Sequence, residues 1–210
     1  MSYRYGICME GNEDAFTDAV ELALEPNFVY VEIGLANAGT TAGVLQFLND
    51  RNQEHWKIFG IDIPEGWALN MDYCKNALKD VLHDVLTMPE GPIDTPDKTA
   101  TIILKPGADV LRTQFPHEIS FAFVDGCHGK ACAMNDFLAV VEHSKVGTVV
   151  VFHDTTPWCQ GIHLQPHCGT GIGVRKGIIE LGLLNNMFPG WQLIEETNSQ
   201  HGIVVVRRNR

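Results

Sequence analysis

The chain has 210 residues, of which 45% are hydrophobic and 20% charged, so it can bury a core and is not disordered as a whole. It carries 15 Lys and Arg against 26 Asp and Glu, and this net charge of −11 disfavours nucleic acid, because phosphates repel an acidic surface. No apolar run is long enough for a membrane helix, the first residues lack a signal-peptide core, and six cysteines are too few for a disulfide scaffold. We therefore expect a single domain over residues 1–210, with no membrane contact and free thiols, in the cytoplasm.

Strand and helix patterns alternate along the sequence. In the first half, we expect a helix at 16–24, a strand at 28–33, a helix at 44–48, a strand at 57–63, a helix through 71–85, a loop at 87–98 and a strand at 99–104. In the second half, we expect a strand at 119–125, a helix through 134–141, a strand at 146–153, a loop at 155–171, a helix at 173–184 and strands at 191–195 and 202–207.

This alternation predicts an α/β fold, in which a mainly parallel sheet is covered by helices on both faces. The last two strands are separated by only six residues, 196–201, which leaves no room for a helix and favours an antiparallel hairpin. Ligands of such sheets bind beyond the carboxyl ends of the strands. Functional residues are therefore expected where the strands end.

The first strand ends in a glycine-rich turn that contains Glu32, Gly34, Gly39 and Thr40. Gly34 allows a sharp turn and a close approach of ligand to backbone, and the helix that opens at Gly39 offers free N–H groups. The turn does not match the dinucleotide-binding motif Gly-x-Gly-x-x-Gly, because it lacks the second glycine. It does not match a P-loop either, because it lacks the Gly-Lys pair. Asp62, at the end of the second strand, is placed to accept hydrogen bonds from the two hydroxyls of a ribose.

Two further strands end in carboxylate and imidazole side chains. Asp125 and His128 follow the strand at 119–125, and His153 and Asp154 follow the strand at 146–153. Two acids and two histidines beyond buried strands are more than helix capping requires. They suit a divalent metal, a general base, or both.

Together these motifs resemble a known family. Glu-Ile-Gly-x-x-x-x-Gly-Thr, Gly-Ile-Asp, Val-Asp-Gly-x-His, Phe-His-Asp-Thr and Gly-Val-Arg-Lys, spread over residues 28–180, are similar to the class I S-adenosylmethionine-dependent methyltransferases. Within that class, the pair Asp-Gly-x-His and His-Asp-Thr resembles the branch of metal-dependent small-molecule O-methyltransferases, the macrocin-type enzymes and the cephalosporin-hydroxylase-like proteins.

The resemblance implies a Rossmann-like three-layer sandwich, with a seven-stranded sheet in the order 3-2-1-4-5-7-6 and its last strand antiparallel. It implies S-adenosylmethionine as cofactor, with Asp62 on the ribose. Glu32, Gly34, Gly39 and Thr40 would surround the methionine moiety. The adenine would lie near Gly107, Ala108 and Asp109. A divalent metal, Mg²⁺ or Mn²⁺, would be held by Asp125, His153 and Asp154.

The function expected from this resemblance is metal-assisted O-methylation of a small hydroxylated molecule, with His128 or Asp125 as general base and a homo-oligomer as a possible assembly. Three residues depart from the family pattern: Ala38 replaces the usual second glycine, Cys127 replaces an acid, and His153 replaces a carboxylate of some members. These departures keep two alternatives open, namely a non-catalytic nucleoside-binding or regulatory domain and a metal-dependent hydroxylase.

The loop at 155–171 contains two cysteines and two histidines: Cys159, His163, His167 and Cys168. A closed zinc site is one interpretation of these four residues. Their spacing fits no standard zinc motif, and the several glycines of the loop favour a mobile lid over the substrate. We therefore predict a lid.

Overall fold

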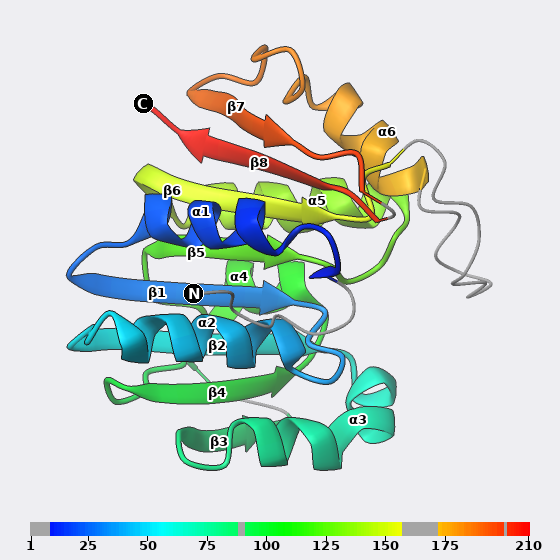
Figure 1. Ribbon diagram of the computed structural model, residues 1–210. Coiled ribbons are helices and arrows are strands. Elements are labelled where there is room, and N and C mark those ends of the chain that lie inside the picture. The colour runs from blue at the N-terminus through cyan, green and yellow to red at the C-terminus, as the bar shows by residue number, and fades with distance from the viewer. Residues whose placement is uncertain (1–8, 88–90, 157–171, 200) are drawn as a thin grey trace.

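The computed structural model describes residues 9–87, 91–156, 172–199 and 201–210, and these form an eight-stranded sheet between two layers of helices (Figure 1). The strand order is β3-β4-β2-β1-β5-β6-β8-β7. The strands are β1 (Asn27–Ile33), β2 (His55–Asp62), β3 (Leu82–Leu86), β4 (Thr99–Leu104), β5 (Ile119–Val124), β6 (Ser144–His153), β7 (Trp191–Glu196) and β8 (Ile203–Arg208). All neighbouring pairs from β3 to β6 are parallel, and β8 is antiparallel to both β6 and β7.

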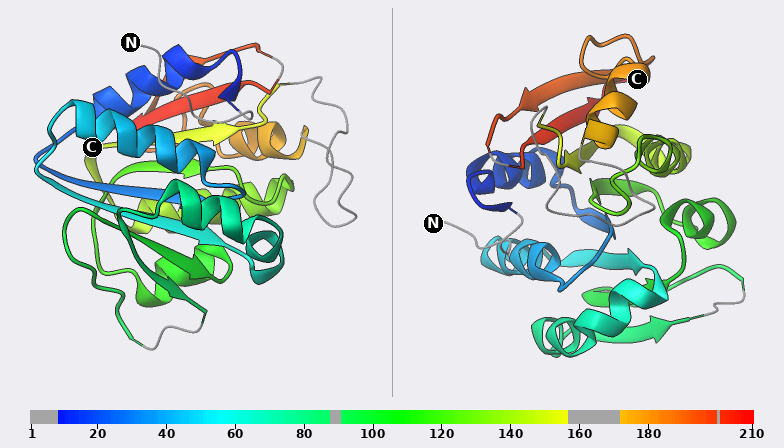
Figure 2. Two further views of the ribbon diagram at one scale, coloured as in Figure 1. Left: turned by 60° about the horizontal axis from the view of Figure 1, so that its bottom comes forward. Right: turned by 90° about the vertical axis from the view of Figure 1, so that its right-hand side faces the viewer.

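Three helices cover each face of the sheet (Figure 2). The first layer contains α1 (Glu13–Ala23), α2 (Gly39–Asp50) and α3 (Pro64–Ala77), and the second contains α4 (Gly107–Gln114), α5 (Lys130–Glu142) and α6 (Ile172–Glu180). Side chains of a strand alternate between the two layers, so Tyr30 packs in the first core and Val31 in the second. The central strands are therefore apolar on both faces, which is the reason for their continuous hydrophobic runs.

The register of the sheet brings several strand ends to one place. Ile33 of β1 lies beside Ile61 of β2 and Val124 of β5, and Val124 lies beside Phe152 of β6. Because β8 runs the opposite way, its first residue pairs with His153, the last residue of β6. The amino end of β8 therefore lies beside the carboxyl ends of β1, β2, β5 and β6. We call this end of the strands the carboxyl edge.

The seven expected strands are all present, with bounds that differ by no more than two residues from those predicted. The expected helix through 71–85 is wrong in its second half: α3 ends at Ala77, and residues 82–86 form β3 at the edge of the sheet. Val81, Leu82 and Val85 continue the helical spacing of the preceding residues, but Leu82 and Val85 pair with the outer side of β4, and Val81 lies just before β3. The sheet thus has one strand more than the seven expected, and the other seven keep the predicted order.

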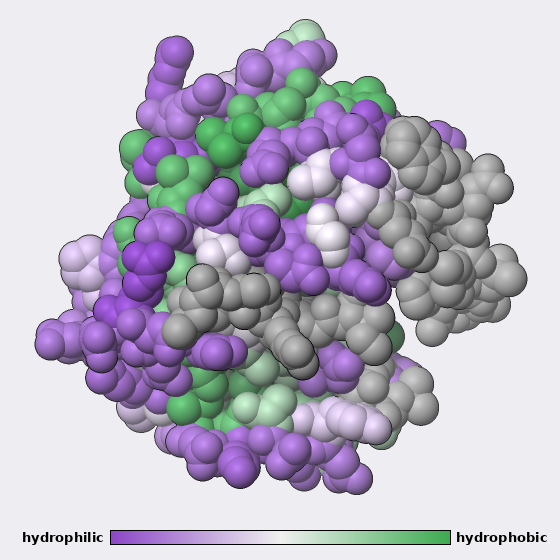
Figure 3. Space-filling model, in the orientation of Figure 1, coloured by the Kyte–Doolittle hydropathy of each residue, from purple (hydrophilic) through white to green (hydrophobic). Residues whose placement is uncertain are grey.

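Helix α4 has no counterpart among the predicted elements, because its eight residues carry few apolar positions. The lid prediction for 155–171 and its four Cys and His residues lie outside the described residues, except for Thr155 and Thr156. The face shown in Figure 3 is mostly hydrophilic. Among the described helices, none combines the length and the apolarity that crossing a membrane requires.

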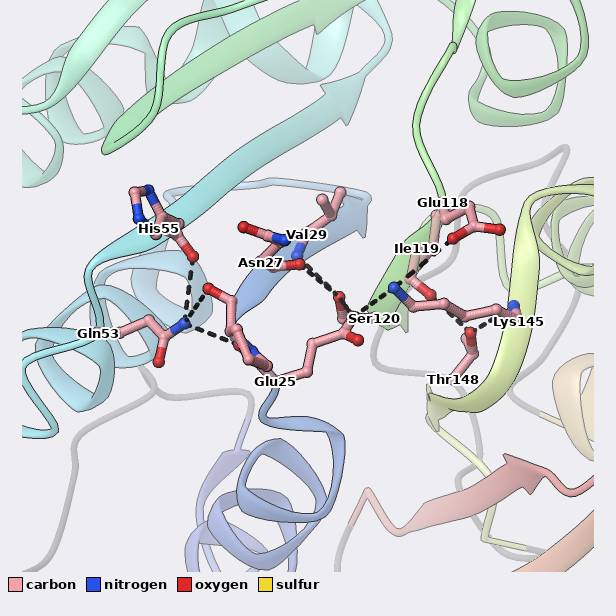
Figure 4. A network of polar contacts seen from close by, with 11 residues as sticks. Glu25, Asn27, Val29, Gln53, His55, Glu118, Ile119, Ser120, Lys145 and Thr148 are labelled. Carbon is pink, nitrogen blue, oxygen red and sulfur yellow. Dashed lines mark hydrogen bonds and ion pairs between the residues drawn. The ribbon is translucent and has the colours of Figure 1, made fainter.

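A polar network ties the amino ends of the strands together, opposite the edge described above (Figure 4). Ser120 accepts a hydrogen bond from the backbone of Val29 at 2.9 Å and donates to Glu25. Lys145 forms an ion pair of 2.9 Å with the same Glu25 carboxylate. This network links the starts of β1, β5 and β6 and so helps to fix the register on which the opposite edge depends.

Candidate functional site

The turn after β1 is shaped by close contact with the end of β5. Gly34 has a φ of +91°, and the N–H of Asp125 donates to the carbonyl of Ile33 at 2.8 Å. The chain then passes through two residues with positive φ, Ala36 and Ala38, before α2 begins at Gly39. Positive φ costs a residue with a β-carbon of the order of 1 kcal/mol or more, so the surroundings must hold this turn in place.

Asp62 and Cys74 supply that support. Asp62 accepts a hydrogen bond from the Ala36 N–H at 3.1 Å and another from the Ile63 N–H at 2.7 Å, and Cys74 donates its thiol to the Ala36 carbonyl at 3.1 Å. Burial raises the pKa of Asp62 above its usual value, and the charge of Asp125 raises it further. Asp62 therefore lies beside the glycine-rich turn, as predicted, although its visible role is to hold the turn.

Glu32 is buried beneath the turn, with 2% of its surface exposed. It accepts hydrogen bonds from the Tyr30 hydroxyl at 2.8 Å and from the Thr41 hydroxyl. Burial raises the pKa of Glu32 to about 8, an effect that these two bonds oppose and that the charges of Asp125 and Asp62 reinforce. Three carboxyl groups thus interact at this edge, which is an environment that favours a cationic ligand.

The other predicted cofactor residues surround the same turn. Gly39 and Thr40 open α2, where the Gly39 N–H donates to the Asn37 side chain at 3.0 Å. Gly107 and Ala108 are buried in the first turn of α4, and a β-carbon on Gly107 would lie 2.6 Å from the Ile33 side chain. Asp109 is exposed. The structure therefore brings the glycine-rich turn, Asp62 and the start of α4 to the carboxyl end of β1.

A cluster of histidine and aspartate side chains lies next to this turn. We call it the His/Asp cluster. Its members are Asp125, His128, His153, Asp154 and His201.

The contacts within the His/Asp cluster are short. His153 Nδ1 lies 2.9 Å from Asp125 Oδ1, and His128 Nε2 lies 3.1 Å from Asp154 Oδ2 and 3.6 Å from Asp125 Oδ1. His153 and Asp154 are each 3% exposed, and Asp154 takes a positive φ of +54°. The two acids and two histidines predicted from strands β5 and β6 do converge.

The charges of the cluster stabilise one another. Burial alone would raise the pKa of Asp125, but the nearby His153 and His128 outweigh it and hold that pKa at about 2. The interaction with the Asp125 carboxylate raises the pKa of His128, burial opposes this shift, and the charge of Asp154 reinforces it. Asp125 is therefore ionised, and His128 has the partner that a general base needs for orientation.

His201 was not predicted. Its Nδ1 lies 3.0 Å from Asp154 Oδ1, and its ring stacks on that of His153 with centroids 5.4 Å apart. The signal was available, because the second strand of a terminal hairpin must run antiparallel to its neighbour and so begin at the carboxyl edge. The rule that ligands lie beyond the carboxyl ends of parallel strands does not include it.

Among the described residues, two groups offer three ligand atoms within 4.8 Å of one another: His153, Asp154 and His201, and Asp125, His128 and Asp154. The predicted trio of Asp125, His153 and Asp154 is spread over both groups. Cys127, which replaces an acid of the family pattern, belongs to neither group. The donor set of imidazoles and carboxylates fits a divalent ion.

Arg175 connects the cluster to α6. Its guanidinium donates to the carbonyl of Thr155 at 3.1 Å and to the carboxylate of Glu196. The arginine of the Gly-Val-Arg-Lys motif thus braces the segment after β6 against α6 and the end of β7.

Comparison with known proteins agrees with this geometry. A family model described as a methyltransferase domain matches residues 31–155, which include the glycine-rich turn, Asp62 and four members of the His/Asp cluster. No curated protein sequence matches the chain.

Solved structures with the same fold come from several methyltransferases. The O-methyltransferase TomG from Streptomyces achromogenes, involved in tomaymycin synthesis and solved with S-adenosylmethionine, is 13% identical, with a TM-score of 0.60 over 95% of this chain and 81% of that one. An O-methyltransferase from Bacillus cereus, solved with S-adenosylhomocysteine, is 13% identical, with a TM-score of 0.61 over 96% and 89%. An rRNA methylase from Streptococcus thermophilus is 10% identical, with a TM-score of 0.60 over 93% and 95%. At these identities the likeness establishes the class I methyltransferase fold and not the acceptor.

Proposed function

Because the chain belongs to the methyltransferase-domain family whose model matches residues 31–155, we propose that it transfers the methyl group of S-adenosylmethionine to a small hydroxylated molecule with the help of a divalent metal. The observation that carries this proposal is the carboxyl edge of the sheet. There the glycine-rich turn with Glu32 and Asp62 forms one side of a site, and the His/Asp cluster forms the other.

The acidic side suits the cofactor. S-Adenosylmethionine carries a sulfonium and an ammonium group, and Glu32 and Asp62 place carboxyl groups beneath and beside the turn. A bound cation would offset the mutual repulsion of these groups. In this proposal Asp62 exchanges part of its hydrogen bonding to the turn for the ribose hydroxyls, and Gly34, Gly39, Thr40, Gly107, Ala108 and Asp109 surround the rest of the cofactor.

The His/Asp cluster suits the acceptor. The methyl carbon of a sulfonium is already electrophilic, so the protein has to align a hydroxyl oxygen with it and remove the proton. His128 is our candidate for the base, because two carboxylates contact its Nε2 and orient the ring, and because it lies in the loop between β5 and α5 and not in the core. Asp125 is the second candidate.

The metal would be held by Asp125, His153 and Asp154. A bound divalent ion lowers the pKa of a hydroxyl that it ligates. The protein's own part is to orient the ligands, and the 2.9 Å contact between His153 and Asp125 does this for two of them. The net charge of −11 favours a small acceptor over ribosomal RNA, although one structural neighbour is an rRNA methylase.

Calorimetry with S-adenosylmethionine and S-adenosylhomocysteine tests the first requirement of the proposal, which is that the chain binds the cofactor. We expect both to bind the purified full chain with micromolar affinity. If neither binds at millimolar concentration, the proposed function is wrong. Release of S-adenosylhomocysteine with a panel of small hydroxylated acceptors then separates an enzyme from a non-catalytic binding domain.

A further inference from the structure

The amino end of β8 adds a histidine to the His/Asp cluster from outside the part of the chain that the family model covers. His201 lies in the β7–β8 connection, just before β8 begins at Ile203, and its Nδ1 lies 3.0 Å from Asp154 Oδ1. Its ring is nearly parallel to that of His153, at an interplanar angle of 22°. Side chains from β6, from the residue after it and from the connection just before β8 therefore face one another.

The backbone holds His201 in this position. The Thr156 N–H donates to the His201 carbonyl and the Thr155 N–H to the Gly202 carbonyl, both at 3.4 Å. These bonds extend the antiparallel pairing in which His153 faces Ile203. A β-carbon on Gly202 would lie 2.5 Å from the Thr156 side chain, so only glycine permits this approach. The location of His201 thus follows from the register of the sheet and does not depend on a freely moving loop.

A buried hydroxyl beside His201 points to a ligand. The side chain of Thr155 is fully buried, and its Oγ1 has no hydrogen-bond partner in the part of the chain that the structure describes. A β-carbon on Gly202 would lie 3.2 Å from this oxygen, which places it next to the residue that follows His201. Buried polar atoms nearly always have a hydrogen-bond partner, and a water molecule bound to a metal ion would supply one for Thr155 Oγ1.

The spacing of the ligand atoms suits a metal. Two ligands that each lie about 2.1 Å from a cation and at right angles to one another are separated by about 3 Å. The contact between His201 and Asp154 has this length, and His153 completes a group whose ligand atoms all lie within 4.8 Å. We propose that His153, Asp154 and His201 form a two-histidine, one-carboxylate site for a first-row transition metal ion, with His201 as a ligand in place of Asp125, whose 2.9 Å contact with His153 orients that ligand.

The choice of His201 changes the expected metal. Carboxylate and water ligands suit Mg²⁺ and Mn²⁺, whereas imidazole suits Fe²⁺, Co²⁺ and Zn²⁺, and two imidazoles in a set of three favour the later transition metals. The site deepens the metal assistance of the proposed function, and its metal binding can be measured without cofactor or acceptor. Asp154 also contacts His128, so the same carboxylate links the metal site to the candidate base.

Titration with Co²⁺ tests the assignment. The full chain is stripped with chelator and titrated with Co²⁺ and, separately, with Mg²⁺, with visible absorption and calorimetry as readouts. We expect the wild-type chain to bind Co²⁺ more tightly than Mg²⁺. His201→Gln should lower the affinity for Co²⁺ by at least about tenfold and should change the affinity for Mg²⁺ by no more than about twofold. The matched control is His55→Gln, because His55 also faces an aspartate, Asp97, at 2.8 Å, but at the other end of the strands.

A second measurement does not depend on any variant. X-ray absorption of the Co²⁺-loaded wild-type chain counts imidazole ligands, and we expect two, whereas the group of Asp125, His128 and Asp154 supplies one. Any of three results would overturn the assignment: the wild-type chain does not bind Co²⁺, the bound Co²⁺ has a single imidazole ligand, or the His201→Gln chain folds and binds Co²⁺ with wild-type affinity. Calorimetry with S-adenosylhomocysteine keeps the two proposals separate, because loss of cofactor binding contradicts the proposed function and leaves the metal site standing.

Discussion

Gly34 and Asp125 are in direct backbone contact at the carboxyl edge of the sheet. A β-carbon built on Gly34 would lie 2.2 Å from the carbonyl oxygen of Asp125, which is far inside the contact distance of real atoms. The turn that faces the proposed cofactor and the residue that begins the His/Asp cluster are therefore joined, so a shift of one moves the other.

Replacing Gly34 by alanine should destabilise the protein and disturb both halves of the site. The positive φ alone costs about 1 kcal/mol. The clash with the Asp125 backbone adds to this, because neither segment can move away without breaking the pairing of β1 with β5. The matched control is Gly91→Ala, since Gly91 has a similar φ of +81° but nothing within 4 Å of its β-carbon position. Urea unfolding should give a clearly larger loss for Gly34→Ala, and equal losses would contradict the contact.

Stability should fall with rising pH because of Glu32. Its pKa is about 8 in the folded protein and 4.5 in the unfolded reference. Below pH 4.5 both states hold the proton. Between pH 4.5 and 8 the unfolded chain releases it while the folded protein keeps it, so the free energy of unfolding decreases over this window, by an amount of the order of a few kcal/mol.

Glu32→Gln isolates this effect, because glutamine remains neutral at every pH. Denaturant unfolding between pH 5 and 9 should show that wild-type stability falls relative to this variant as pH rises. Glu10→Gln, at an exposed position, serves as control. A constant difference between wild type and Glu32→Gln would show that Glu32 is ionised throughout.

Asp62→Ala should weaken S-adenosylmethionine by about 1.5–3 kcal/mol, the range for hydrogen bonds to a charged group. Part of this loss will come from the turn, because Asp62 also holds the N–H of Ala36. Asp84→Ala is a matched control, since Asp84 accepts from the next backbone N–H at 2.7 Å, as Asp62 does, but lies on β3. Calorimetry that finds the same cofactor affinity for Asp62→Ala as for wild type would remove Asp62 from the cofactor site.

The His/Asp cluster should be needed for turnover and not for cofactor binding. Asp154→Asn removes a carboxylate ligand of the proposed metal, and Asp125→Asn removes the charge that contacts His153 and His128, so both should abolish metal-dependent release of S-adenosylhomocysteine. Cys127→Ser should keep activity, because Cys127 belongs to neither ligand group. Full activity in EDTA, with both Asn variants active, would leave His128 as the base of a metal-free enzyme.

The sequence predicts most of the sheet because its central strands are buried on both faces and so are uniformly apolar. The prediction is wrong at β3, because the spacing of Val81, Leu82 and Val85 fits a helix and a strand equally well. The segment forms a strand because it can pair with the outer side of β4. It also misses α4, since Val110 and Leu111 give too short a stripe to be seen as periodic.

The same limit applies to the site. Asp125, His128, His153 and Asp154 could be predicted because residues that follow parallel strands share one edge, a rule that needs only the order of the elements. The antiparallel direction of the last strand brings His201 to the same edge, but its contact with Asp154 and the burial of Glu32 under Thr41 depend on register and packing between segments.

Both margins of the sheet discourage the addition of another strand. At one margin, β3 has only five residues, exposes His83 and Asp84, and shifts register against β4 between Leu82 and Asp84. At the other, β7 shifts register between Leu193 and Glu195 and ends in two glutamates. Short length, charge and irregular pairing are the features by which sheets avoid edge-to-edge aggregation. Copies of this chain that associate would therefore be expected to meet through helices or loops and not by extending the sheet.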